Sequence, residues 1–108
     1  MPIRSDDRLL LLAIPAPQEL AALARVLLRG TLVVIGSPEE IAAAQPSLTE
    51  FDNVMFLEGT PAAIPWRGPG FTKILVPHHL ERLLPHIADE LQRVLAPGGE
   101  IVRTALAV

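Results

Sequence analysis

The sequence predicts an α/β fold in which about five parallel strands lie between two layers of helices. Three observations lead to it. Short apolar runs rich in Leu, Val and Ile alternate with segments whose apolar residues recur at helical spacing. Most of the 11 prolines stand between these segments rather than inside them. Because strands that alternate with helices are joined by right-handed crossovers, the strands should form a parallel sheet covered on both faces.

Five short apolar segments are expected to form the sheet. A continuous apolar run is typical of a strand that is buried on both faces, as the strands of a parallel sheet are. The first run ends at residues 15–17 (PAP), and residues 96–99 (APGG) are expected to form a turn before the last one. In chain order the five segments are residues 8–14, 31–35, 53–57, 72–76 and 100–106.

The first helix is expected over residues 18–29. Its apolar residues recur at helical spacing, and Gly30 stands where a left-handed residue ends many helices. The apolar stripe consists of Leu20, Leu23, Ala24 and Leu27.

The second helix is expected to begin at Pro38, with Ser37 as its cap. Glu40 completes a capping box, in which each residue hydrogen-bonds the backbone of the other. This role of Ser37 is favoured over that of a nucleophile, because no Gly-x-Ser-x-Gly motif surrounds it. Pro46 is expected to end this helix.

The third helix is expected to end at Leu95. Proline inside a helix removes a hydrogen bond, so the regular part is expected to begin at Leu84 or Pro85.

The composition excludes several classes of function. The net charge is −3, the pI is near 5.5 and the nine basic residues are scattered, so neither nucleic acid nor an anionic membrane is an expected partner. No cysteine is present, which excludes disulfides and thiolate chemistry. No apolar stretch is long enough for a signal peptide or a membrane span, so a cytoplasmic location is expected. At this length a single domain, residues 1–108, is expected.

Four segments carry a family resemblance through their order and spacing. They are VVIGSPEEI at 33–41, NVMFLEGTPAAIPW at 53–66, FTKILVPHHL at 71–80 and LQRVLAPGG at 91–99. Together they resemble class I S-adenosylmethionine-dependent methyltransferases over nearly the whole chain. The resemblance implies a Rossmann-like, three-layer α/β/α fold, and S-adenosylmethionine as the cofactor if the protein is active.

The resemblance also implies where such a cofactor would lie. In the family, a glycine-rich turn after the first strand approaches the methionine end of the cofactor. An acidic residue at the end of the second strand binds the ribose, and another after the third strand contacts the adenine. The matching cofactor-binding positions in this sequence are Pro15, Gly36, Ser37, Thr60 and Pro77.

These positions depart from the family pattern. Pro15 and Pro17 replace two glycines of the turn, and Ala13 stands where an acidic residue is common. Proline fixes φ and has no N–H, while Gly36 has no side chain to accept a ribose hydrogen bond. We therefore expect that S-adenosylmethionine binding has been lost and that the domain serves as an interaction or assembly module.

The alternative is a small S-adenosylmethionine-dependent methyltransferase with atypical cofactor contacts. Glu39, Glu40 or Glu58 would then replace a missing carboxylate. Their ordinary role is that of charges in the first turn of a helix or on the surface. Whether the protein is an enzyme stays open.

The fifth strand is expected to form an edge of the sheet. The family normally adds an antiparallel pair of strands after it, and this sequence ends at Val108, so a minimal domain without that pair is expected. An apolar edge strand invites aggregation unless it is paired or covered. We expect the strand from Glu100 to Leu106 to pair with a partner protein or, most simply, with a second copy in a two-fold homodimer.

The histidines could suggest a metal site or a general base. No His-x-x-x-His or HExxH motif is present, so no metal ligand is assigned. His79 is the candidate base, but no nucleophile or orienting carboxylate accompanies it, and no catalytic residue is assigned. Trp66 and Phe71 flank a loop rich in Pro and Gly and are expected to pack in the core rather than on a ligand. The residues weighed as metal ligands are His78, His79, His86, Glu81, Asp89 and Glu90.

Overall fold

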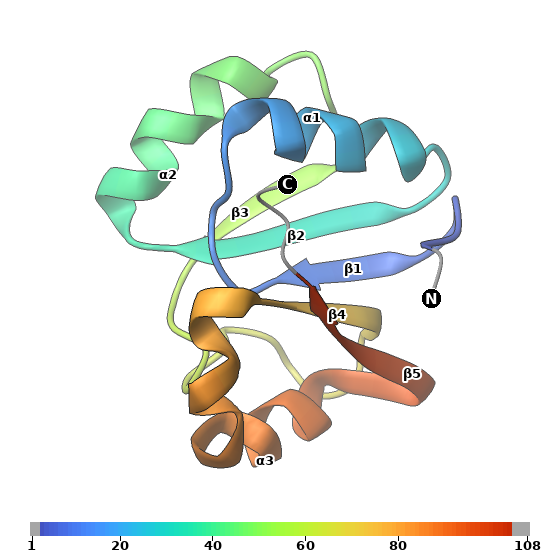
Figure 1. The fold of residues 1–108 in the computed structure, drawn as a ribbon. Coiled ribbons are helices and arrows are strands. Elements are labelled where there is room, and N and C mark those ends of the chain that lie inside the picture. The colour runs from blue at the N-terminus through green and yellow to red at the C-terminus, as the bar shows by residue number, and fades with distance from the viewer. Residues whose placement is uncertain (1–2, 105–108) are drawn as a thin grey trace.

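A computed structural model describes residues 3–104. Its centre is a sheet of five parallel strands in the order β3-β2-β1-β4-β5 (Figure 1). The parallel sheet expected from the apolar runs is therefore confirmed. The end of the predicted fifth strand, Leu106, lies outside the described residues. The strands are β1 (Arg8–Leu11), β2 (Thr31–Gly36), β3 (Val54–Glu58), β4 (Phe71–Pro77) and β5 (Leu95–Thr104).

Helices cover both faces of the sheet. In Figure 1, α1 (Pro17–Val26) and α2 (Pro38–Ala44) lie on one face and α3 (Leu84–Val94) lies on the other. Two short 3-10 helices complete the connections, η1 (Gln45–Leu48) after α2 and η2 (His78–Leu83) before α3. The expected three-layer α/β/α arrangement is confirmed. None of the helices within residues 3–104 is both long and apolar enough to span a membrane.

The core consists of two apolar layers, one on each face of the sheet. Successive side chains of a strand point to opposite faces, so each strand contributes to both layers. On one face Leu9 packs in a cluster with Leu20 of α1, and on the other Leu10 packs in a cluster with Leu91 of α3. All four side chains are fully buried. This burial on both faces explains the apolar runs of β1, β2 and β4, whereas the edge strand β3 has no buried residue.

The start of α2 matches the prediction. The Ser37 hydroxyl accepts a hydrogen bond from Glu40 N at 3.2 Å, and Glu40 Oε1 accepts one from Ser37 N at 2.9 Å. The capping box is therefore confirmed. It fixes the direction in which the chain leaves β2.

The end of α1 differs from the prediction. The helix ends at Val26 rather than at residue 29, because Leu27 already has non-helical angles (φ −87°, ψ 53°). The side-chain amide of Asn53 donates to Ala24 O at 3.0 Å and to Leu27 O at 2.9 Å. A residue distant in the sequence thus satisfies the last carbonyls of α1.

Gly30 is not the left-handed cap that was predicted, since its φ is not positive. Glycine is required at this position by a close approach of two backbones. A Cβ atom at residue 30 would lie 2.1 Å from Asp7 O. That carbonyl accepts the hydrogen bond from Thr31 N at 3.1 Å, so it cannot move without loosening β1 from β2.

β5 also differs from the prediction, because it begins at Leu95, directly after α3, and not at Glu100. Phe71 of β4 pairs with Leu95, and Lys73 pairs with Glu100. Residues 96–99, predicted as a turn before the strand, are instead a bulge within it. Gly98 has φ 80° there, a left-handed conformation that glycine adopts without strain.

Asp7 and Lys73 are the buried charged residues of the described chain. Lys73 Nζ lies 3.4 Å from both carboxylate oxygens of Asp7. Asp7 also accepts hydrogen bonds from Arg4 N at 2.7 Å and from Thr72 Oγ1 at 2.7 Å. Burial raises the pKa of Asp7, but these hydrogen bonds together with the Lys73 charge outweigh it and leave the pKa below its ordinary value.

Residues 59–70 join β3 to β4 without a helix, and α3 holds this loop. Glu90 Oε2 accepts a hydrogen bond from Ile64 N at 2.7 Å. Arg93 donates to Ile64 O at 2.8 Å and to Trp66 O at 2.6 Å. Arg93 also binds the Glu90 carboxylate at 2.7 Å. The hydrogen bonds from Arg93 and then from Ile64 N lower the pKa of Glu90 to about 2.

The substitution Gly30→Ala should lower the free energy of unfolding by about 1 to 3 kcal/mol, the usual cost of adding an atom to a fully packed position. Its Cβ would press on a backbone carbonyl that is fixed by the pairing of β1 with β2. Chemical denaturation measures the change. Leu28→Ala is the matched control in the same turn, because Leu28 is 80% exposed. Equal stability of Gly30→Ala and the control would contradict the close approach.

The substitution Glu90→Gln should flatten the acid dependence of stability. The pKa of Glu90 in the fold is about 2 against an ordinary 4.5, so its ionised form stabilises the fold above the ordinary value. That contribution is lost as the pH falls from about 5 toward 2. Thermal unfolding followed by circular dichroism should show a smaller fall in Tm over this range for the variant than for the wild type. Glu39→Gln, at an exposed site, should behave as the wild type. Parallel curves for wild type and Glu90→Gln would rule out the assigned role.

Candidate functional site

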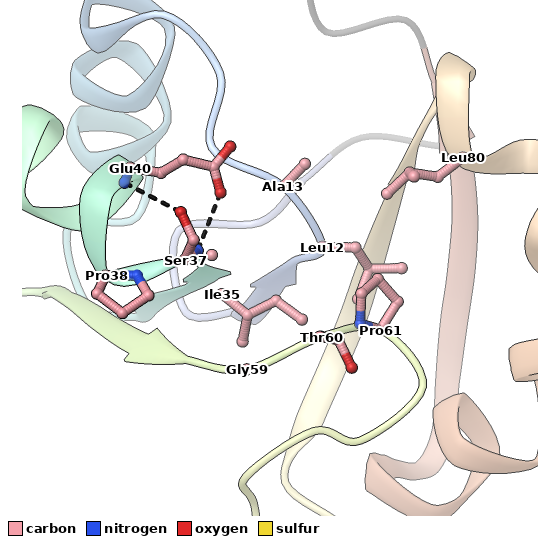
Figure 2. A pocket seen from close by; sticks show the side chains of 11 residues that line it. Leu12, Ala13, Ile35, Ser37, Pro38, Glu40, Gly59, Thr60, Pro61 and Leu80 are labelled. Atoms are coloured by element: carbon pink, nitrogen blue, oxygen red, sulfur yellow. Dashed lines mark hydrogen bonds between the residues drawn. The ribbon is translucent and has the colours of Figure 1, made fainter.

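A pocket of about 450 Å³ lies beyond the carboxyl ends of β1, β2 and β3 (Figure 2). The strand order reverses beside it, since the chain builds β1, β2 and β3 outward and then returns to place β4 on the other side of β1. Ligands of open parallel sheets bind outside the carboxyl ends of the strands at such a reversal. The volume is also in the range of small-molecule sites.

The walls of the pocket are mainly apolar. Leu12 and Ile35, which end the buried runs of the first two strands, are 3% and 0% exposed. Leu80 of η2 approaches from the far side, and Pro38 and Pro61 complete the walls. The strands thus provide an apolar surface for a flat or aliphatic ligand.

The polar side chains of the pocket are Ser37, Glu40 and Thr60. Figure 2 shows Ser37 and Glu40 joined by the two hydrogen bonds of the capping box. Glu40 is the only ionisable residue among the described residues that line the pocket. Its Oε1 is used in the capping box, and Oε2 has no hydrogen-bond partner within residues 3–104. One carboxylate oxygen is therefore free to accept.

A side chain at residue 36 would meet Ile14. A Cβ atom at this position would lie 2.7 Å from Ile14 Cδ1, so Ile14 would have to turn away. The same Cβ would lie 3.3 Å from Glu40 Oε1. The carboxylate of Glu40 therefore lies beside the end of β2, in contact distance of the place where a side chain at residue 36 would begin.

Three of the five predicted site positions are brought together here. Gly36, Ser37 and Thr60 line the pocket. Pro15 lines a neighbouring depression of about 240 Å³, and Pro77 is buried at the end of β4 and is not among the lining residues. Contact of any of the five with a cofactor stays a prediction.

The loop before α1 borders that depression and offers few hydrogen-bond donors. Pro15 and Pro17 have no N–H. The N–H groups of Glu19 and Leu20 both donate to Ala16 O. No side chain caps the helix, and Glu19 adds a negative charge to its first turn. The loop before α1 therefore offers few groups that could bind an anion.

Several lining residues were not predicted from the sequence, among them Leu12, Gly59 and Leu80. Leu12 belongs to the first apolar run, and its place at the end of that run was the available signal. The contact of Ile14 with Gly36 could not be predicted from the sequence, because it depends on how the loop turns after β1.

The histidines do not assemble a site. His78 Nδ1 lies 3.2 Å from Glu81 Oε2 on the surface, and Glu90 binds Arg93 rather than His86. No group of three or more His, Asp or Glu residues that could hold a metal ion occurs within residues 3–104. The expected core packing of Trp66 and Phe71 is confirmed: both belong to one apolar layer, and their ring centroids lie 4.7 Å apart.

Comparison with known proteins shows similarity in structure. No protein-family model and no curated protein matches the chain. An S-adenosylmethionine-dependent methyltransferase from Aquifex aeolicus matches with a TM-score of 0.82 and 20% identity, over 94% of this chain and 57% of that one. The [4+2]-cyclase SpnF matches with a TM-score of 0.79 and 25% identity, over 95% and 40%. Fibrillarin from Aeropyrum pernix, solved with natively bound S-adenosylmethionine, matches with a TM-score of 0.73 and 15% identity, over 95% and 47%.

The chain spans about half the length of the solved structures that it matches. Within that span the match covers nearly all of this chain, 94% of it for the Aquifex aeolicus protein. The described residues therefore have the fold of class I S-adenosylmethionine-dependent methyltransferases.

Proposed function

We propose that this domain has kept the methyltransferase scaffold, has lost S-adenosylmethionine as a methyl donor, and serves as an interaction or assembly module. The observation that carries the proposal is the loop before α1. A methyl donor has to be held at both its nucleoside and its amino-acid end, and this loop is the wall nearest the amino-acid end in the family resemblance.

The residues of this loop do not fit the amino-acid end of the cofactor. That end carries a carboxylate, which needs N–H donors or a cation. Pro15 and Pro17 cannot donate, and the carboxylate of Glu19 would repel a second one. No Lys, Arg or His is found among the described residues that line the pocket or the depression beside it.

The assembly role rests on the free edge of the sheet at β5. Within the described residues this strand is paired on one side only, by β4. Its regular part contains Ile101 and Val102, which are half-buried. An open apolar edge can extend its sheet by pairing with another strand. The simplest partner is the same edge of a second copy, in an antiparallel arrangement with two-fold symmetry.

The second candidate is a small S-adenosylmethionine-dependent methyltransferase with atypical contacts. The observation in its favour is that the prolines line the neighbouring depression and leave the pocket of about 450 Å³ open. The fold does not decide between the two candidates, since a protein described as a [4+2]-cyclase also has it.

Isothermal titration separates the two candidates. S-adenosylmethionine and S-adenosylhomocysteine should give no binding heat at about 1 mM ligand, because the loop before α1 offers few donors to the carboxylate of either ligand. A methyltransferase that binds both, titrated in the same buffer, is the positive control. A dissociation constant below about 100 μM corresponds to a binding free energy of more than about 5 kcal/mol. Such a value would contradict the proposal that cofactor binding has been lost.

Self-association through β5 should protect the backbone amides at this edge of the sheet. Amide hydrogen exchange should slow at residues 100–104 when the protein concentration rises from about 2 to about 200 μM, and light scattering should then report a dimer. The opposite edge strand, β3, is the internal control and should not change. A monomer across this range, or equal protection of both edges, would argue against pairing through β5.

A further inference from the structure

We propose that β3, the strand at the other edge of the sheet, is the docking site for an extended segment of a partner protein, and that this segment is apolar and flanked by Lys or Arg. Within the described residues β3 is paired on one side only, by β2. The inference goes beyond the proposed function, since it concerns a different edge and a different partner from the self-pairing of β5. Its grounds are the regular geometry of β3, its apolar side chains and the charge around it.

β3 is the more regular of the two edge strands. Its register with β2 runs without a shift from Val54 to Glu58, and it contains no proline. β5 by contrast carries Pro97 and the bulge at residues 96–99 in its first half. Proline, lysine and bulges are common means by which edge strands avoid pairing. β3 has none of these three, so its edge is open to an added strand.

The backbone of β3 presents three residues to the open side. Asn53 O accepts a hydrogen bond from β2 at 2.8 Å, and Gly59 N donates one to β2 at 3.2 Å. Alternate residues of a parallel strand bond the same neighbour, so the odd-numbered residues of this stretch bond β2. The N–H and C=O groups of Val54, Phe56 and Glu58 therefore face the side on which no strand lies within residues 3–104. An added strand would find three donors and three acceptors there.

The side chains of β3 are apolar on both faces of the sheet. Val54 and Phe56 pack in the layer under α1 and α2, Leu57 packs in the layer under α3, and all three are only half-buried. Met55 is 44% exposed, and the alternation of side chains along a strand puts it on the face of Leu57. A segment that is apolar on both of its own faces would extend both layers of the core.

The charge around β3 indicates the chemistry of the partner. Residues 30–66 contain five carboxylates and no Lys, Arg or His, whereas the rest of the chain contains seven carboxylates and nine Lys or Arg. Glu50, Asp52 and Glu58 border β3 and are exposed, and none of them forms an ion pair within the part of the chain that the structure describes. A segment with a cation near each end is therefore complementary to this edge, and a nucleic acid is repelled by it.

The same charge disfavours a second copy of the chain as the partner at β3. Pairing of two β3 strands would bring Glu50, Asp52 and Glu58 of both copies together, and like charges across a strand pair are destabilising. Arg25 of α1 does not neutralise them, because its guanidinium lies over the ring of Phe51, 5.5 Å from the centroid, and forms no ion pair within residues 3–104. The two edges of the sheet are thus suited to different partners.

The test is selection of a displayed library of random peptides of about 12 residues on the whole chain. Enriched peptides should contain an apolar run bordered by Lys or Arg. With the most enriched peptide bound, amide hydrogen exchange should slow at Val54, Phe56 and Glu58, while Met55 and Leu57, which already bond β2, should change little. No enrichment over the uncoated support would overturn the inference.

Charge reversal at the end of β3 is the informative variant. Glu58→Lys should weaken the peptide about fivefold, the effect of losing one exposed ion pair. Asp89→Lys is the matched control, at an exposed site on α3 that forms no ion pair within residues 3–104, and should leave binding unchanged. Val54→Pro removes one outward N–H at the first residue of the strand and should also weaken the peptide several-fold. Equal effects of the two charge reversals would overturn the role of the charge.

Salt provides a second measurement of the same charge. Raising the NaCl concentration from about 0.1 to about 1 M shortens the Debye length from about 10 to about 3 Å. The loss of affinity should therefore be larger for the wild type than for Glu58→Lys. The same loss for both proteins would contradict an attraction that involves Glu58.

The outcomes are distinguishable from those of the proposed function. Slower exchange at Val54 and Phe56 when the protein is concentrated without peptide would make a second copy the partner and overturn the basic segment. Enrichment of acidic peptides, or protection of residues 100–104 in place of β3, would overturn it as well. Failure at β3 leaves the self-pairing of β5 and the loss of the methyl donor standing, because neither rests on residues 50–58.

Discussion

The whole sheet depends on the way in which Asp7 joins three strands. Its carbonyl oxygen accepts Thr31 N at the start of β2, and its carboxylate binds Thr72 and Lys73 at the start of β4. Lys73 in turn lies 3.8 Å from Glu100 of β5. Removing either partner of a buried ion pair leaves the other charge buried and unpaired, so any register that separates Asp7 from Lys73 is disfavoured. The register of β1, β2 and β4 is thus set at their amino ends, which leaves their carboxyl ends free to form a pocket.

At the carboxyl ends the geometry comes from backbone and capping contacts. Gly59 N donates to Gly36 O at 3.2 Å and holds the end of β3 against that of β2. Arg93 and Glu90 then hold the rest of the loop on α3. None of these contacts requires the residues that a methyl donor needs. A scaffold of this kind can lose its cofactor contacts and still keep a well-formed pocket.

The sequence predicted the parts of the fold that local patterns determine. The buried strands follow from their apolar runs, and the start of α2 follows from Ser37 and Glu40. Gly30 was misjudged because a glycine after a helix can serve a left-handed turn or a close approach, and only the position of Asp7 O decides between them. The predicted start of β5 was wrong because bulges and turns favour the same residue types, and residues 96–99 (APGG) fit either. The hydrogen bonds of Arg93 to Ile64 and Trp66 could not be predicted, since the two acceptors are backbone carbonyls 29 and 27 residues away in the sequence.

The contacts of Trp66 give this protein a built-in optical reporter. It is the only tryptophan of the chain, which has no tyrosine, so nearly all intrinsic fluorescence originates from this one indole. The ring is half-buried against Phe71, and its own carbonyl is bound by Arg93. Any detachment of the loop from α3 changes the solvent around the indole and therefore its emission wavelength. The loop that forms one wall of the pocket can be followed in real time without a label.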